Sequence, residues 1–262
     1  MNNYFHQKTV LITGGAGGLG VALTEQLLAQ GANVAVLDLN VDAIASSNNL
    51  LTLALDITNT EALEQAVEKI ISVFGQIDIL FNNAGITHMS TFLNTTPKNF
   101  DTIMAVNFTA SVNITRFCLP YLIKQKGQIV AISSVAGYAP LYGRSSYSAS
   151  KHAMEGFFKS LACEVADKGI AISIVCPSFL KTRPELKVEV NNGLSSPGAL
   201  KKNTNGKQLS PSIAANKIIK AVINKKETLY LGKVSIIAYW LNTLAPNIYR
   251  KIMIKNSKEE FT

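Results

Sequence analysis

The stretch Thr9-Val-Leu-Ile-Thr-Gly-Gly-Ala-Gly-Gly-Leu-Gly20 decides the fold. Its first five residues predict a buried strand over 9–13, and the pattern over 18–30 predicts a helix directly after the glycines. The start of such a helix offers free N–H groups and a partial positive charge to phosphates. A glycine-rich turn in this position is therefore typical of a dinucleotide-binding unit, whereas glycines without the strand and helix indicate only a turn.

Each glycine has a separate expected task. Gly14 permits the tight turn, Gly18 lets the backbone approach the pyrophosphate, and Gly20 permits close packing of the helix on the sheet. Leu19, in the same first turn, completes this part of the predicted cofactor-binding set.

The rest of the chain alternates apolar runs with helical patterns. The runs are continuous, which is typical of parallel strands buried on both faces, and the alternation predicts right-handed crossovers. We therefore expect an α/β fold with a doubly wound parallel sheet, in a single domain over 1–262. Further strands are expected at 33–38, 51–55, 77–81, 128–133 and 171–176, and helices at 60–74, from about Pro97, and at 147–168.

Two aspartates follow strands at the predicted site. Asp38 ends the second strand, where its carboxylate can bind both ribose hydroxyls of NAD and would repel a 2′-phosphate. Asp56, followed by Ile57, ends the third strand and can bind the adenine amino group. The alternatives are a solvated strand end for Asp38 and a capping turn for Asp56, with Asn59 or Thr60 as the helix cap.

Tyr147 and Lys151 form the candidate catalytic pair. They lie four residues apart, which places them one turn apart on one face of a helix. A nearby ammonium stabilises a phenolate and lowers its pKa, so the tyrosine can transfer a proton. Ser134 precedes Tyr147 by 13 residues, at the end of a strand, and can stabilise charge on a substrate oxygen. Such helical pairs are common alone; the combination with Ser134 and the glycine turn is not.

Together these motifs resemble the short-chain dehydrogenase/reductase family, over nearly the whole chain to about residue 230. The resemblance implies a Rossmann-type sheet of seven strands in three α/β/α layers and a Ser-Tyr-Lys-Asn tetrad. The matching motifs are Thr13-Gly-x-x-x-Gly-x-Gly20, Asp56, Asn82-Asn-Ala-Gly85, Asn107, Ser134, Tyr147-x-x-x-Lys151, and Pro177 with Thr182.

The resemblance also implies a role for each residue. Ser134 would orient the substrate, Tyr147 would transfer the proton, and Lys151 would lower the Tyr147 pKa and bind the nicotinamide ribose. Asn107 would position a water that extends a proton relay. The remaining cofactor contacts would be Asn83, Ala84 and Gly85 along the cofactor, Pro177, and Thr182 near the carboxamide of the cofactor. One departure is Ser178, where the family usually has glycine after Pro177.

These residues predict an NAD-dependent oxidoreductase that transfers a hydride between nicotinamide and a secondary alcohol or ketone. One alternative is a 3-ketoacyl-thioester reductase using NADPH, which Asp38 disfavours. Another is a non-catalytic dinucleotide-sensing protein, against which the intact tetrad argues. No metal is expected, because the three histidines and three cysteines show no ligand spacing.

Charge is divided unevenly along the chain. Residues 1–180 hold 10 Lys and Arg against 12 Asp and Glu, whereas residues 181–262 hold 15 against 5. The basic last third suggests an anionic partner, or simple solubility. The odd cysteine count and the lack of a secretory pattern predict a cytoplasmic protein.

The substrate side is expected in loops beyond the strand ends. Val135, Tyr138, Leu141 and Tyr142 suggest an apolar pocket, although each could instead pack against neighbours. The polar, turn-rich segment 183–210 predicts a mobile substrate loop that could act as a lid.

The segment 233–262 predicts an amphipathic helical extension that Pro246 divides in two. Its apolar stripe and flanking lysines and arginine suit a peripheral membrane contact through 233–258 or packing on protein. The pattern favours packing on protein, because apolar stripes usually pack. The extension suggests a hydrophobic or lipid-like substrate. The resemblance further implies a homodimer or homotetramer built on the two long helices that carry Asn107 and Tyr147.

Overall fold

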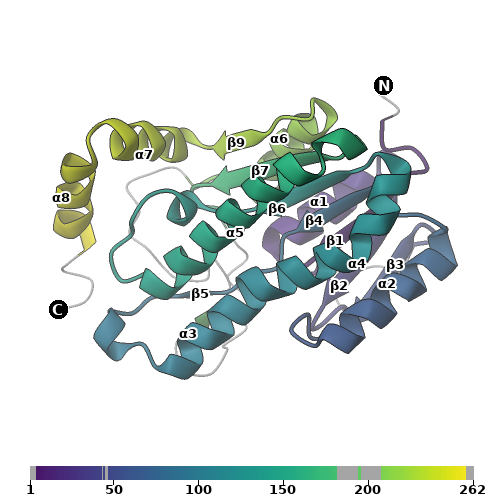
Figure 1. Cartoon of the computed structure of the whole chain (residues 1–262), viewed down its shortest axis with the longest axis horizontal. Helices are drawn as coiled ribbons and strands as arrows, with labels where there is room; N and C mark the ends of the chain where they lie inside the picture. Colours follow the sequence, from purple (N-terminus) through teal and green to yellow (C-terminus); the bar gives the residue numbers. More distant parts are fainter. Residues whose placement is uncertain (1–3, 43, 45–46, 182–193, 196–207, 258–262) are drawn as a thin grey trace.

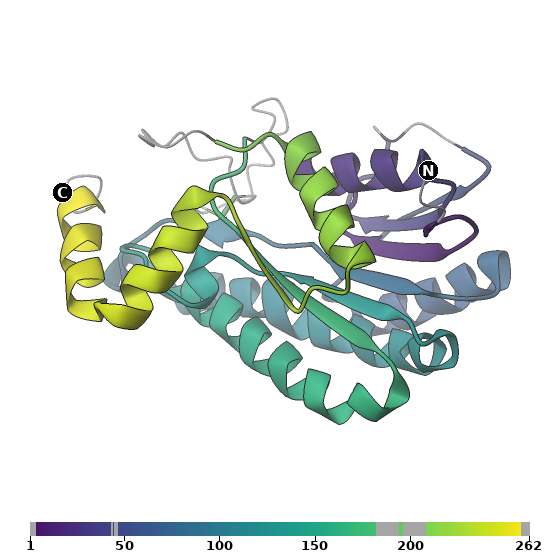
Figure 2. The ribbon, with the colours of Figure 1, turned by 90° about the horizontal axis from the view of Figure 1, so that it is seen from above.

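The computed structural model describes residues 4–42, 44, 47–181, 194–195 and 208–257. A central sheet lies between two layers of helices, and two further helices extend from one edge of the sheet (Figure 1). Figure 2, a view from above, separates the layers: the purple α1 and green α6 lie on one side of the sheet and the teal helices on the other.

The sheet has seven parallel strands in the order β3-β2-β1-β4-β6-β7-β9. The order reverses between β1 and β4, and the carboxyl ends of strands at such a reversal form the usual ligand crevice. The predicted Rossmann-type α/β fold is confirmed. The strands are β1 (Thr9–Thr13), β2 (Asn33–Asp38), β3 (Leu50–Ala54), β4 (Ile79–Asn82), β6 (Gln128–Ile132), β7 (Ala171–Pro177) and β9 (Thr228–Leu231).

Alternate residues of each strand fill two separate cores. On β1, Leu11 faces α2 (Thr60–Phe74), α4 (Ala110–Gln125) and α5 (Ser145–Glu164). Its neighbours Val10 and Ile12 face α1 (Gly18–Leu28) and α6 (Pro211–Ile223). Both faces of the strands are buried, which explains why the sequence shows continuous apolar runs rather than alternation.

Local signals set both ends of α2 where they were predicted, whereas α1 ends two residues earlier than expected and α5 begins two residues earlier and ends four residues earlier. Asn59 caps α2 by accepting a hydrogen bond from the Ala62 N–H, and Gly75 ends the helix in the left-handed conformation. The helix expected from Pro97 is present as α3 (Pro97–Met104), but a π-helical turn, η2 (Ala105–Thr109), separates it from α4.

The last third adds elements whose bounds were not predicted, α6 and β9. The prediction that Pro246 divides the C-terminal segment is confirmed, because α7 (Lys233–Leu244) ends before it and α8 (Pro246–Ser257) begins at it. No described helix is both long and apolar enough to cross a membrane.

Several short elements complete the described chain. Two strands, β5 (Thr87–His88) and β8 (Leu194–Ser195), pair antiparallel in a second small sheet. Three 3₁₀ turns are present at η1 (Phe92–Asn94), η3 (Val135–Gly137) and η4 (Ala166–Lys168). The predicted substrate loop over 183–210 lies almost wholly outside the described residues.

Candidate active site

The ends of β1 and β4 are tied together at the crevice. The Thr13 hydroxyl accepts hydrogen bonds from the backbone N–H groups of Asn83 and Ala84, both at 3.1 Å. The Asn83 amide donates to the carbonyls of Thr13 at 3.0 Å and Gly14 at 2.9 Å. The Asn83 side chain, predicted as a cofactor contact, therefore clamps the glycine turn in place and leaves the approach to the cofactor to the backbone.

The glycine turn is packed so closely that its backbone leaves no room for side chains at two positions. Gly14 has a φ of +66°, and a Cβ on it would lie 2.7 Å from the Ala84 Cα. A Cβ on Gly20 would lie 2.1 Å from the Gly14 carbonyl oxygen. Helix α1 starts with no side-chain cap and no acidic residue in its first turn, so its N–H groups remain for phosphate oxygens. Gly18 and Leu19 lie in that turn.

Asp38 lies beside the glycine turn. Its Oδ2 accepts a hydrogen bond from the Ala16 N–H at 2.9 Å, and its Oδ1 accepts one from the Leu39 N–H at 2.8 Å. These bonds orient a carboxylate at the end of β2, where a ribose would be bound. The carboxylate of Asp56 instead accepts hydrogen bonds from the Thr58 N–H and hydroxyl, both at 2.8 Å. These bonds form the turn before α2 that was the alternative role for Asp56. Ile57 is half-buried beside it.

Tyr147 and Ser134 meet at the carboxyl end of β6. The Ser134 hydroxyl lies close enough to the Tyr147 phenol to lower its pKa, and Tyr147 is buried. The neighbouring Ser133 instead donates to the buried Glu155 carboxylate at 2.8 Å. Only Ser134 is thus directed at Tyr147, which supports its selection by spacing.

Burial raises the pKa of Tyr147, and the Ser134 hydroxyl and the Arg144 guanidinium oppose this rise. Lys151 lies on the same helix face, with Nζ 5.9 Å from the Tyr147 ring centre. The net pKa of Tyr147 is therefore raised in the protein without cofactor, because the desolvation of a buried phenol outweighs these two groups; a lowering effect of Lys151 stays a prediction.

Lys151 is itself buried, and its ammonium donates to the Ile132 carbonyl at 2.8 Å. Burial lowers the pKa of Lys151 to about 8, against the opposing effects of Cys176 and Glu155. An ammonium whose pKa lies this close to 7 can exchange protons with neighbouring groups near neutral pH.

Asn107 lies on the π-helical turn η2 and joins the loop after β4, which contains Gly85 and Ile86, to α5. Its Oδ1 accepts from the Ile86 N–H at 2.8 Å, and its Nδ2 donates to the Ile86 carbonyl and the Ser150 hydroxyl, each at 2.9 Å. A Cβ on Gly85 would lie 3.3 Å from Asn107 Oδ1 and 3.6 Å from Lys151 Nζ. Gly85, Asn107 and Lys151 are therefore brought together.

Two residues of the site were missed by the sequence reasoning. Glu155 lies one turn beyond Lys151, buried, and receives hydrogen bonds from Ser133 and from Lys159, the latter at 2.8 Å. Arg144, just before α5, bonds the Thr87 hydroxyl of β5 and lies close enough to affect Tyr147. The sequence does contain a signal for Glu155, because it follows Lys151 by four residues on the same helix. It contains no such signal for Arg144, which lies in a loop.

On the substrate side the apolar-pocket interpretation changes. Val135, Tyr138 and Leu141 pack in a cluster with side chains of α7 and α8, so they serve packing. The Tyr138 hydroxyl lies 2.8 Å from both oxygen atoms of Ser235 on α7. Tyr142 is half-buried.

At the end of β7, Pro177 pairs with Leu231 of β9. Ser178 occupies the family's glycine position without a positive φ, and its side chain fits because Gly232 has none. Thr182 lies outside the described residues.

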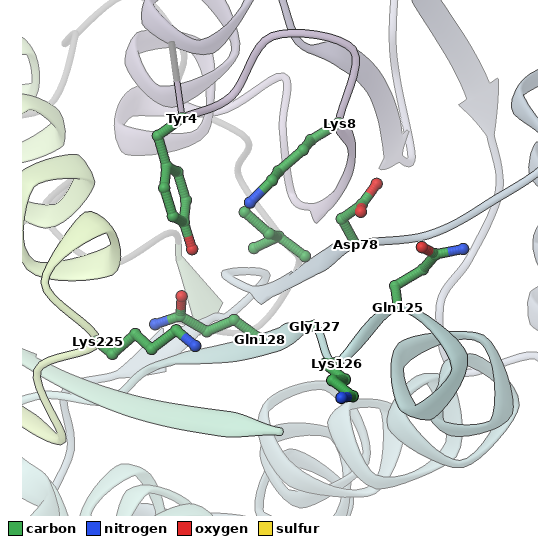
Figure 3. A pocket seen from close by; sticks show the side chains of 9 residues that line it. Tyr4, Lys8, Asp78, Gln125, Lys126, Gly127, Gln128 and Lys225 are labelled. Carbon is green, nitrogen blue, oxygen red and sulfur yellow. The ribbon is translucent and has the colours of Figure 1, made fainter. Parts of the chain in front are cut away.

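A separate cavity of about 140 Å³ lies at the opposite edge of the sheet (Figure 3). It is lined at the amino ends of β1, β4 and β6 by residues that include Tyr4, Lys8, Asp78 and Gln128. Doubly wound folds bind ligands at the carboxyl ends, so this cavity is not part of the dinucleotide site. Among the residues that the structure describes, no group of three His, Cys, Asp or Glu could hold a metal ion.

Comparison with known proteins agrees with this geometry. Residues 8–192 match the family described as short chain dehydrogenase. The chain belongs to the short-chain dehydrogenase family. Family membership makes it an oxidoreductase that binds a nicotinamide dinucleotide and acts on a CH–OH group.

Among short-chain dehydrogenases, it is 34% identical to the Dehydrogenase/reductase SDR family protein 7-like of Anopheles gambiae, over 98% of this chain and 85% of that protein. A 3-oxoacyl-[acyl-carrier-protein] reductase of Thermotoga maritima is 35% identical over 67% of this chain and 75% of that protein. A short chain dehydrogenase from Burkholderia cenocepacia, solved in complex with NADP, shares the fold with a TM-score of 0.80 at 22% identity, over 95% of this chain and 98% of that one.

Proposed function

We propose that this short-chain dehydrogenase uses NAD(H) to interconvert a secondary alcohol and a ketone of hydrophobic or lipid-like character. The observation that carries the proposal is the convergence of Ser134, Tyr147 and Lys151 at the carboxyl end of β6, beside Gly85. In this proposal the four catalytic residues are Ser134, Tyr147, Lys151 and Asn107.

Each residue has a task that its contacts support. The nicotinamide supplies or accepts the hydride when bound. Ser134, whose hydroxyl lies near the Tyr147 phenol, holds the substrate oxygen and stabilises charge that develops on it. Tyr147 gives a proton to that oxygen during reduction and removes it during oxidation. The ammonium of Lys151 favours the phenolate and can bind the ribose.

Asn107 holds this arrangement together. Both polar atoms of its amide are used, on the Ile86 backbone and on the Ser150 hydroxyl, which lies on the helix that carries Tyr147 and Lys151. In this proposal Asn107 is required because it joins the loop that contains Ile86 to helix α5. The water-mediated proton relay implied by the family resemblance stays a prediction.

NAD rather than NADP is proposed because of Asp38. Its carboxylate is fixed by the Ala16 N–H next to the pyrophosphate turn, so a 2′-phosphate there would meet a negative charge. The same proposal includes the remaining predicted cofactor contacts, which are Gly14, Gly18, Leu19, Gly20, Asp56, Ile57, Asn83, Ala84, Pro177 and Thr182.

The experiment that tests the activity is a screen of alcohols and ketones of graded chain length with NAD(H). We expect turnover of a hydrophobic secondary alcohol or its ketone. The Tyr147→Phe variant should bind NADH with unchanged affinity but lose turnover, because the ring remains and only the acid/base is removed. Unchanged turnover in this variant would contradict the role of Tyr147.

A second candidate is an NADPH-dependent 3-ketoacyl-thioester reductase. It is favoured by the name of the Thermotoga relative and by the basic last third of the chain. Direct titration with both cofactors separates the candidates. Tighter binding of NADPH than of NADH would contradict the use made of Asp38.

We also propose a homodimer or homotetramer formed through α4 and α5, and a reducing compartment such as the cytoplasm. The second proposal is motivated by the free thiols of Cys118, Cys163 and Cys176. Sedimentation velocity of the whole chain measures the first directly. A monomer at micromolar concentration would contradict it.

A further inference from the structure

The outer sides of α7 and α8 carry an unusual share of the exposed apolar surface. Among described residues, 14 large hydrophobic side chains are exposed, and eight of them lie on these two helices. These eight are Val234, Ile236, Ile237, Trp240, Leu244, Ile248, Ile252 and Ile254. We call them, with the basic side chains described below, the α7–α8 face.

The face on α7 is the side that the protein leaves uncovered. Ser235 and Ala238 are buried against the rest of the chain, whereas Ile237 is 62% exposed and Leu244 is 76% exposed. An apolar hollow of about 370 Å³ opens among the exposed side chains, with Trp240 in its lining. Contiguous apolar surface of this kind marks an interaction site.

Charge identifies what covers the face. From Lys233 to Ser257 the sequence has four basic residues and no acidic one. The four, Lys233, Arg250, Lys251 and Lys255, are all exposed, and neither of the two ion pairs found among described residues includes them. The combination of apolar side chains, an exposed tryptophan and unbalanced positive charge complements a surface of anionic lipid headgroups.

The same charges argue against a second copy as the occupant. A symmetric contact places the same patch of both subunits together, so the basic residues of one α7–α8 face would meet those of the other. Like charges placed face to face at an interface cost free energy, and no acidic residue on these helices offsets it.

The face is also connected to the catalytic loop. Helix α7 packs on η3, which begins directly after Ser134, and Ser235 of α7 hydrogen-bonds to the Tyr138 hydroxyl and to the Cys176 carbonyl. Figure 1 shows α7 continuing from the edge strand β9, and α8 turning away beyond the sheet. Docking through these helices would hold the substrate loops close to the lipid surface.

We propose that the α7–α8 face binds the surface of an anionic bilayer peripherally. The apolar side chains would enter the interface between headgroups and acyl chains, and the four basic residues would contact lipid phosphates. Binding itself does not depend on the redox activity. The further consequence, that the substrate is taken from the bilayer, rests on the proposed function.

Flotation of the full-length protein with vesicles tests the binding. We expect binding to phosphatidylcholine vesicles that contain phosphatidylglycerol at low salt, and loss of binding to pure phosphatidylcholine. The Ile237→Glu/Leu244→Glu variant should not float. The matched control is Val73→Glu/Ile213→Glu, which changes side chains 48% and 52% exposed on other helices and should float like the natural protein.

The charge contribution has its own comparison. Replacing Arg250, Lys251 and Lys255 by Gln should weaken binding to the anionic vesicles on the order of a hundredfold, because each charge contributes about fivefold. Replacing the exposed Lys217, Lys220 and Lys226 by Gln should change it far less, although both triple variants lose the same net charge.

Two outcomes would overturn the proposal. One is no flotation of the natural protein at low salt. The other is a change from dimer to monomer in the Ile237→Glu/Leu244→Glu variant during sedimentation without lipid, which would identify the face as a protein interface. Turnover of a water-soluble ketone should remain in the non-floating variant. The proposed function is tested separately on the natural protein, because flotation without turnover of any ketone would contradict that function and leave lipid binding intact.

Discussion

At the scale of single residues, the site depends on carboxylates whose partners differ. Asp38 is held by the Ala16 N–H of the glycine turn, whereas Glu155 is buried beneath the catalytic helix with Ser133, Cys176 and Lys159. In the proposed function, Asp38 selects the cofactor. Glu155 acts on no reacting atom, but its charge reaches Lys151.

Asp38→Ala should weaken NADH binding and reduce the preference over NADPH. Hydrogen bonds to a charged group contribute about 1.5–3 kcal/mol, so the Kd for NADH should rise by about tenfold to a hundredfold. Fluorescence titration with both cofactors measures this. Asp42→Ala, at an exposed carboxylate four residues later, should change neither Kd. An unaltered preference in Asp38→Ala would show that another group selects the cofactor.

Glu155→Gln should shift the pH profile of the reaction. Glu155 raises the pKa of Lys151, which burial lowers to about 8, so removing the negative charge should lower that pKa further. The ammonium would then lose its proton at lower pH, and the alkaline limb of kcat/KM should move towards neutral. The amide retains the size of the side chain and an acceptor for Ser133.

The control for this prediction is Glu164→Gln, an exposed position on the same helix, whose profile should not move. A lower rate in Glu155→Gln with an unchanged pH profile would indicate only a structural role.

At the scale of elements, the glycine turn is the part with the least freedom. Gly14→Ala should abolish cofactor binding, because it adds a Cβ 2.7 Å from the Ala84 backbone as well as the strain of a left-handed residue. Gly75→Ala is a matched control: its φ is +76°, but nothing lies within 4 Å of the added Cβ.

Both variants should lose about 1–2 kcal/mol of folding stability from backbone strain. Only Gly14→Ala should lose more and fail to bind NADH by calorimetry. Normal NADH binding by Gly14→Ala would mean that Ala84 can move aside, and that the turn is less constrained than its contacts indicate.

The elements also show how far sequence reasoning extends. The bounds of β1, β2 and α2 were predicted to the residue, because apolar runs, the Asn59 cap and Gly75 are local signals. The π-helical turn around Asn107 was not predicted. It depends on Asn107 binding the distant Ile86 and Ser150, and no local pattern encodes such contacts.

For the site, the sequence predicted that four residues lie near the crevice: Ser134, Tyr147, Lys151 and Asp38. Their spacing and their positions at the ends of strands were sufficient for this. The direction of the Tyr147 pKa did not, because it is decided by burial among residues from several elements. The packing of Val135, Tyr138 and Leu141 against α7 and α8 likewise depends on how the last third folds back.

At the scale of the whole molecule, the proposed cofactor site draws on both halves of the sheet. The candidate site takes the turn after β1 and Asp38 after β2 from one half, and Gly85, Ser134 and Tyr147 from the other. Their only common point is the reversal of strand order between β1 and β4. A ligand bound across this point interacts with the folded chain alone, so it should stabilise the entire fold rather than one loop.

NADH should therefore raise the melting temperature of the full chain. A ligand at a hundred times its Kd contributes about 2.7 kcal/mol to the free energy of unfolding. For a chain of this size each kcal/mol shifts Tm by about 2–4 °C, so calorimetry should record a rise of about 5–10 °C. The same concentration of NADPH, or NADH with Asp38→Ala, should give a smaller rise. No rise at an NADH concentration a hundred times its measured Kd would mean that NADH does not bind the folded chain in preference to the unfolded one, and this would contradict a site that exists only when the two halves of the sheet are assembled.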